Sequence, residues 1–294
     1  MRRMPIILVF LLFGFVAYEE TTDFTKLDDF RKLNTALFEA SKKGWAEDIP
    51  RLLEMGASIT ARDRFGNTAL LLAAQSPKSK GVEILLEAGS DIDHRNLKGS
   101  TALLKAVRAG RGKTARMLMA AGASINQANL QNLMPLTAAA FNGDARMVQS
   151  LLDKGAGIDP VDQSGKSPIL YAAGKGYTNI VEKLLSAGVA IDRRYGNNLT
   201  ALMWAAGYAN DVPAREGLKT VATLLENGAP IDLVDDRGRS ALMIAVAMGH
   251  ASVVEHLLEN GANPAIIDKG GKSALDLARA SDNSGIVQIL EPLR

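Results

Sequence analysis

The sequence contains no cysteine, only three histidines and 5% aromatic residues among its 294 positions. The absence of cysteine excludes disulfides, thiolate catalysis, iron–sulfur clusters and cysteine-ligated zinc. Neither sign of charge prevails, since 34 basic and 32 acidic residues leave a formal net charge of +2. A nucleic-acid-binding protein usually concentrates far more positive charge, so we expect no nucleic-acid partner. What is present is 47% hydrophobic residues, which is ample for a packed core.

The N-terminus has the pattern of a secretory signal. A short positive segment, Met1 to Arg3, is followed by an apolar run from Ile6 to Val16. We predict a signal peptide over residues 1–17 and a polar tether over 18–32. The mostly apolar segment 6–18 has 13 residues and would span about 20 Å as a helix, whereas the bilayer hydrocarbon is about 30 Å thick. We therefore expect no stable membrane span after cleavage. The predicted location is the periplasm; the alternatives are secretion, or retention at the inner membrane by an uncleaved signal anchor.

Two landmarks recur along the rest of the chain with one period. A glycine that follows an apolar pair recurs at intervals of 33, 33, 33, 33, 40 and 33 residues, at Gly56, Gly89, Gly122, Gly155, Gly188, Gly228 and Gly261. A second marker, in most cases Thr or Ser, keeps the same step at Thr35, Thr68, Thr101, Met134, Ser167, Thr200, Ser240 and Ser273. Two landmarks in register indicate a repeat protein.

One unit shows the physical basis of the repeat. Ser167 is suited to an N-cap and Pro168 to the first helical position, and a short helix rich in alanine follows. After a glycine-containing break, residues 179–185 place apolar side chains at helical spacing. Gly188 then suits a left-handed C-cap. Each helix pair leaves an apolar face that only a neighbouring unit can cover, so we predict an all-α solenoid of stacked helix pairs.

These units resemble ankyrin repeats. The first-helix pattern of that family is matched by NTALLLAA at 67–74 and LTALMWAA at 199–206, and the second-helix pattern by NIVEKLL at 179–185 and SVVEHLL at 252–258. The resemblance covers residues 33–294 in about eight units. It implies antiparallel helix pairs with projecting β-hairpin loops, and a concave face of loop tips and first helices that binds a protein partner.

Two irregularities suggest where a partner would bind. The 40-residue interval predicts a seven-residue insertion near 208–217, and four of the five tyrosines lie close to it. Aromatic anchors and arginines are enriched at binding hot spots, and basic loop tips favour a partner with an acidic patch. The alternatives are that the rings fill the stack, that the charges are merely solvated, and that the insertion is a tolerated loop extension. The candidate partner-binding residues are Phe141, Tyr171, Arg194, Tyr195, Trp204, Tyr208, Arg237 and Arg239.

The sequence offers no recognisable arrangement of catalytic residues. His250 and His256 are six residues apart, which is off the spacing that would place both on one metal, and His94 is expected to be solvated in a loop. The full phosphate-binding pattern Gly-x4-Gly-Lys-Ser/Thr does not occur in the sequence. We therefore expect no enzyme, no metal and no cofactor.

The sequence predicts a monomeric interaction module of the bacterial envelope that binds or inhibits a partner protein, including the case of an immunity-type inhibitor. The alternatives are a secreted ankyrin effector that binds a host protein and a purely structural envelope protein.

Overall fold

The computed structural model describes residues 24–208 and 212–293. Within these ranges the chain forms sixteen α-helices and two 3-10 helices, and no strand. The first and second helices alternate along the chain, with the bounds α1 (Phe24–Lys43), α2 (Asp48–Glu54), α3 (Ala69–Ala73), α4 (Lys80–Glu87), α5 (Ala102–Arg108), α6 (Gly112–Ala120), α7 (Pro135–Phe141), α8 (Ala145–Asp153), α9 (Pro168–Gly174), α10 (Thr178–Ser186), α11 (Ala201–Ala206), α12 (Ala214–Glu226), α13 (Ala241–Met248), α14 (Ala251–Glu259), α15 (Ala274–Ala280) and α16 (Ser284–Leu290). The 3-10 helices are η1 (Gly196–Asn198) and η2 (Glu291–Leu293).

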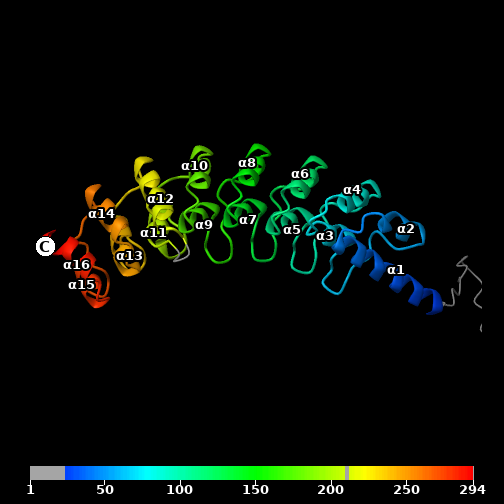
Figure 1. Ribbon diagram of the computed structural model, residues 1–294, viewed down its shortest axis with the longest axis horizontal. Helices are drawn as coiled ribbons and strands as arrows, with labels where there is room; N and C mark the ends of the chain where they lie inside the picture. The colour runs from blue at the N-terminus through cyan, green and yellow to red at the C-terminus, as the bar shows by residue number, and fades with distance from the viewer. Residues whose placement is uncertain (1–23, 209–211, 294) are drawn as a thin grey trace, which may run out of the picture.

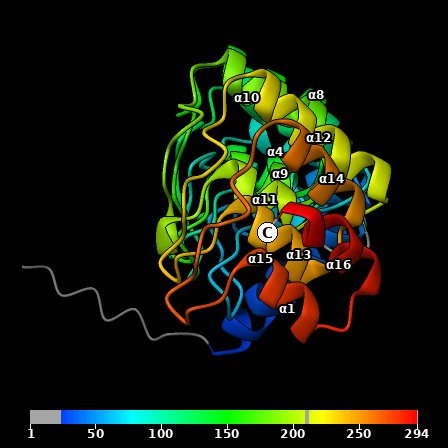
Figure 2. The same ribbon diagram turned by 90° about the vertical axis from the view of Figure 1, so that its left-hand side faces the viewer.

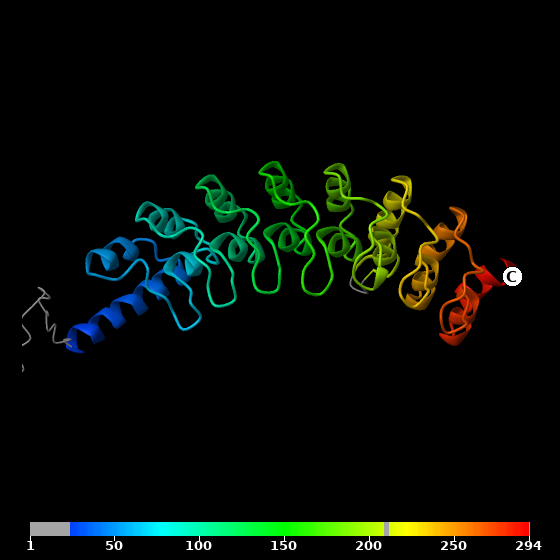
Figure 3. The ribbon, with the colours of Figure 1, turned by 180° about the vertical axis from the view of Figure 1, so that it is seen from behind.

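The helix pairs stack side by side into a curved array (Figure 1). The first helices form an inner row and the second helices an outer row, and the view from behind shows the same arc (Figure 3). Seen along the array, the loops gather on one side and the helices on the other (Figure 2). The loops and the first helices therefore line the concave side of the arc.

The core runs without interruption along the stack. First helices approach one another closely because they carry small buried residues such as Ala172 and Ala173, both 0% exposed. Second helices bury one stripe each, for example Val148 and Leu151 in α8. Gly188 ends α10 with a φ of +102°, which confirms the predicted left-handed cap.

The cap of α9 differs from the expectation. Pro168 begins the helix as predicted, but the Ser167 side chain accepts no capping hydrogen bond. Capping side chains do act at Thr101, Thr200, Ser240 and Ser273, each of which accepts a hydrogen bond from the backbone N–H three residues later. Proline at the first helical position leaves one fewer N–H group to satisfy in α9.

The projecting loops contain no strands in the described ranges, contrary to the expected β-hairpins. Each loop is instead joined to the next by a backbone hydrogen bond near its tip, for example from Leu97 N to Phe65 O and from Gln163 N to Gln131 O, both 3.0 Å. The same link recurs from Leu130 N to Lys98 O and from Lys269 N to Arg237 O. These links fix the tips relative to one another, so the loops form one continuous edge.

The predicted tether is in part a helix. α1 begins at Phe24 and runs to Lys43, so residues 24–32 continue into the first unit instead of tethering it. Its C-terminal half buries Leu37 and Ala40 against the array, which stabilises a helix that propensity alone would not hold. The predicted signal peptide, 1–17, and the start of the predicted tether lie outside the described residues. In the described part of the chain no helix combines the length and the apolar character needed to cross a bilayer.

The insertion lies between α11 and α12. The 13-residue α12 is longer than α10 and α14, which have nine residues each, so part of the extra length is an additional helical turn. Residues 209–211 within the predicted insertion lie outside the described residues.

Candidate protein-binding surface

The concave side carries a cluster of three rings and two lysines. The rings of Phe141 and Tyr171 meet edge to face, with centroids 5.4 Å apart and planes at 86°. The Lys166 ammonium lies 5.5 Å from the Tyr171 centroid and 5.0 Å from that of Trp204, and so joins these two rings. Lys175 lies 5.1 Å from the Phe141 centroid. We call these five residues the aromatic–lysine cluster.

This cluster is accessible to a partner. Phe141 is 48% exposed, and the other four residues are half-buried. Tyr171 and Trp204 occupy equivalent positions of adjacent first helices, α9 and α11, which pack directly against each other. The structure thus brings together three of the rings singled out from the sequence.

Asp162 positions Tyr171 within the cluster. The Tyr171 hydroxyl donates a hydrogen bond of 2.6 Å to Oδ2 of Asp162. Burial and this bond raise the pKa of Tyr171. Burial by itself would raise the pKa of Asp162, but hydrogen bonds from Tyr171, Ser164 and the backbone of Lys166 outweigh it and hold that pKa below its ordinary value.

Two of the predicted partner-binding tyrosines are packing residues. Tyr195 is 8% exposed and its hydroxyl donates to the Asp159 carboxylate at 2.9 Å. Burial and the nearby Asp159 charge raise the Tyr195 pKa far above its usual range. Tyr208 is 5% exposed and stacks on His250 with ring centroids 3.7 Å apart. Neither ring presents a free face to a partner, because each fills a space between neighbouring units.

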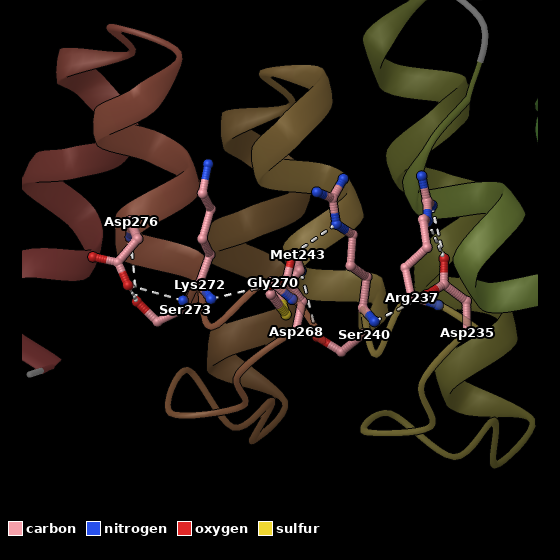
Figure 4. A network of polar contacts seen from close by, with 10 residues as sticks. Asp235, Arg237, Ser240, Met243, Asp268, Gly270, Lys272, Ser273 and Asp276 are labelled. Carbon is pink, nitrogen blue, oxygen red and sulfur yellow. Dashed lines mark hydrogen bonds and ion pairs between the residues drawn. The ribbon is translucent and has the colours of Figure 1, made fainter.

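The three predicted arginines lie on the loops. Arg237 pairs with Asp235 at 2.7 Å, and Arg239 pairs with Asp268 of the next loop at 3.1 Å. Figure 4 shows how the Asp235–Arg237 pair lies beside the loop of Asp268 and the capped helix starts at Ser240 and Ser273. Arg194 donates to the Val234 carbonyl at 3.0 Å. Arg194 and Arg239 therefore link adjacent loops, whereas Arg237 pairs within its own loop. Arg237 and Arg239 are neutralised by carboxylates.

Five other cations on the concave side have no carboxylate partner. In the described ranges Lys98, Lys105, Arg108, Lys166 and Lys175 form no ion pair. Two loop carboxylates lie near these cations, since the Asp63 charge acts on Lys105 and Asp162 lines a hollow with Lys98 and Arg108. Both carboxylates also accept backbone N–H groups of their own loops. Burial lowers the pKa of Lys105, and the charges of Arg108 and Lys98 lower it further against the opposing effect of Asp63. The groove between α5 and α11 is therefore electropositive.

Sequence reasoning missed Lys105, Arg108 and Lys175 as members of this surface. The signal that reveals Lys105 and Arg108 is a comparison of first helices at the 33-residue step, which places Lys105 at the position of Tyr171 and Arg108 at that of Phe141.

The histidines have structural contacts. His94, expected to be solvated, is 9% exposed and its Nε2 lies 2.9 Å from the Gly66 carbonyl. His250 Nδ1 lies 3.0 Å from the Ala206 carbonyl. Among the residues that the structure describes, no group of three His, Asp or Glu side chains is arranged to hold a metal ion.

Comparison with known proteins gives one family. The family model of ankyrin repeats (3 copies) matches residues 7–96, 37–129, 136–214 and 211–292. No curated protein matches the chain. The ankyrin repeats of this family generally act as protein–protein interaction modules. Since the matches cover most of the sequence and the helix pairs follow the same period, this chain belongs to the ankyrin-repeat family.

Proposed function

We propose that this chain is an exported, non-catalytic interaction module of the bacterial envelope that binds a partner protein through its concave face. The observation that carries the proposal is the aromatic–lysine cluster, in which three rings and two unpaired lysines share one accessible surface. Export rests on the signal-like pattern at residues 1–17. We further propose that binding inhibits the partner, as in an immunity-type protein.

The cluster combines features that favour tight association. Half-buried aromatic side chains lose little conformational entropy on binding, and their truncation at hot spots costs about 2 kcal/mol or more. The linked loop tips and packed first helices hold the surface in place before binding. The electropositive groove supports an acidic partner, because unpaired cations increase the association rate with a negatively charged surface and favour it over other surfaces.

The proposal is tested by affinity capture from envelope and secreted fractions of the source organism. The full chain is compared with the double variant Tyr171→Ala/Trp204→Ala and with Glu182→Ala, a control on the exposed face of α10. We expect a specific partner to be retained by the wild type and the control and lost by the double variant, with helical content unchanged by circular dichroism. An enzymatic partner is then assayed with and without the chain to test inhibition.

Two outcomes would contradict this function. If the folded double variant captures the partner as well as the wild type does, the aromatic–lysine cluster is excluded as the binding site. If no specific partner is captured, a structural role is favoured. Fractionation distinguishes location: accumulation in culture supernatant or in host cells would favour a secreted effector over a module retained in the envelope.

A further inference from the structure

A packing rule links successive units on the concave side. The side chain at the position of Tyr171 covers the residue three places after the equivalent position of the preceding unit. Tyr171 itself meets Phe141, and Trp204 lies over Gly174, where an added Cβ would come within 2.9 Å of the indole. Ile244 covers Gly207 in the same way, at 2.8 Å.

Ala138 departs from this pattern. Ala138 occupies the covering position on α7, and the residue that it would cover is Arg108. Its single methyl group is too short to fill the space, and a cavity of about 270 Å³ remains there. The cavity is lined by Arg108, Leu133, Ala138, Phe141, Asn142 and Tyr171.

Most polar groups around this cavity are already satisfied. The Asn142 amide donates to the carbonyls of Val107 and Arg108, and the Tyr171 hydroxyl donates to Asp162. The walls therefore offer two aromatic rings and the Leu133 side chain. The Arg108 guanidinium is the charged group of the lining, and it has neither a side-chain hydrogen bond nor an ion pair in the described ranges.

The size of the cavity indicates what it would hold. An apolar cavity of about 150 Å³ accommodates benzene, whereas sites for drug-sized ligands usually exceed about 300 Å³. The volume of about 270 Å³ therefore suits one bulky apolar side chain of a protein partner.

Charge defines the neighbourhood of that side chain. Arg108 also lines an adjoining polar hollow, together with Lys98, Asn129, Gln131 and Asp162. Lys105 lies one helical turn before Arg108 on α5. Lys105 experiences the repulsion of Arg108 and Lys98 and the attraction of Asp63. Asp162 already accepts the Tyr171 hydroxyl and two backbone N–H groups of its own loop. A further carboxylate that binds among the three cations would relieve their mutual repulsion.

We propose that the cavity above Ala138 is an anchor pocket for a bulky apolar side chain of an acidic partner segment, with a neighbouring carboxylate of that segment paired to Arg108. This inference rests on the proposed concave-face function and names the chemistry that the face recognises. The occupant is a peptide segment in which a Leu, Met or aromatic residue stands beside Asp or Glu.

The test uses random linear peptides displayed on phage and selected against the full chain. Selected peptides are then synthesised, and their affinities are measured by fluorescence anisotropy at low and at high salt. The variants are Ala138→Leu, which fills the cavity, and Arg108→Gln, which removes the charge. Leu72 already occupies the equivalent position on α3, so the backbone accepts leucine there. Ala138→Val is the smaller filler if the leucine variant is poorly folded.

We expect selected peptides to carry an apolar residue beside an acidic one. Ala138→Leu and Arg108→Gln should each weaken binding about tenfold or more, and Arg108→Gln should also reduce the salt dependence. Peptides that lose affinity for Tyr171→Ala/Trp204→Ala but bind Ala138→Leu normally would overturn the pocket and leave the proposed function standing. Basic or neutral consensus peptides would overturn the carboxylate assignment. Binding that no concave-face variant weakens would contradict the proposed function itself.

Discussion

At the scale of single residues, Asp162 connects the loop edge to the candidate binding surface. Its Oδ1 accepts the backbone N–H groups of Ser164 and Lys166, at 2.8 and 3.2 Å, while Oδ2 accepts the Tyr171 hydroxyl. Asparagine performs the same backbone role in equivalent loops, where Asn96 and Asn129 accept two backbone N–H groups each. An amide oxygen is thus sufficient to accept the backbone hydrogen bonds of the turn, and the charge of Asp162 strengthens them.

This comparison predicts different effects for two substitutions at Asp162. Asp162→Asn keeps the acceptor oxygen and should cost less than about 1 kcal/mol at neutral pH, whereas Asp162→Ala leaves several donors unpaired and should cost about 1–3 kcal/mol. Because the folded-state pKa lies below the ordinary value of 3.8, the stabilisation by the charge is present above about pH 4 and is lost as pH falls through the folded pKa. Urea unfolding at several pH values measures both effects. Equal stability of the alanine and asparagine variants would contradict the assigned hydrogen bonds.

At the scale of helices, the extension of α12 depends on a close contact with the segment that precedes it. Gly217 is buried in the fourth position of α12, and a Cβ added there would overlap the Tyr208 ring. That ring also stacks on His250 of the next unit. The glycine therefore allows the tyrosine to fill the space between α12 and α14.

We expect Gly217→Ala to destabilise the protein although alanine is the better helix former. The gain in helix propensity is about 1 kcal/mol, while forcing apart a packed ring costs about 1–3 kcal/mol. Gly285→Ala is the matched control in α16, where the added Cβ would meet only Asn283 at 3.7 Å. Thermal unfolding should give a lower midpoint for Gly217→Ala and an unchanged or higher one for the control. A stabilised Gly217→Ala would exclude close packing of Tyr208.

The helices also show how far the sequence predicts this structure. The repeat period located the helix pairs, because Pro168 and Gly188 act through local backbone geometry. The burial of Tyr195 and Tyr208 was not predictable in this way, since it depends on Asp159 and His250, which come from other units. The start of α1 is not predictable from the sequence because its polar first half resembles a tether, whereas packing of its second half stabilises the helix. The anchor pocket likewise results from a missing side chain, which becomes visible only when neighbouring units are packed together.

At the scale of the whole molecule, stability is distributed along a line of neighbours. Each inner helix packs against the inner helices before and after it, as α7 does with α5 and α9 and α13 does with α11 and α15. In such an array the free energy is approximately a sum of unit terms and nearest-neighbour interfaces. A destabilising substitution at one end should therefore unfold only the units near that end, and the binding surface between α5 and α11 should stay folded.

Leu257→Ala tests this locality. Leu257 in α14 is 0% exposed, so truncation should cost about 2–5 kcal/mol through lost burial and the cavity left behind. We expect hydrogen exchange followed by mass spectrometry to show lost protection in α13–α16 and unchanged protection in α3–α8, because local opening requires only the interfaces next to the cavity. The exposed residue Glu255 of the same helix provides the control Glu255→Ala, which should leave exchange unchanged. A uniform loss of protection along the array would instead mean that all units unfold together. In that case the concave surface would depend on every interface of the array, and Leu257→Ala would weaken partner binding from a distance.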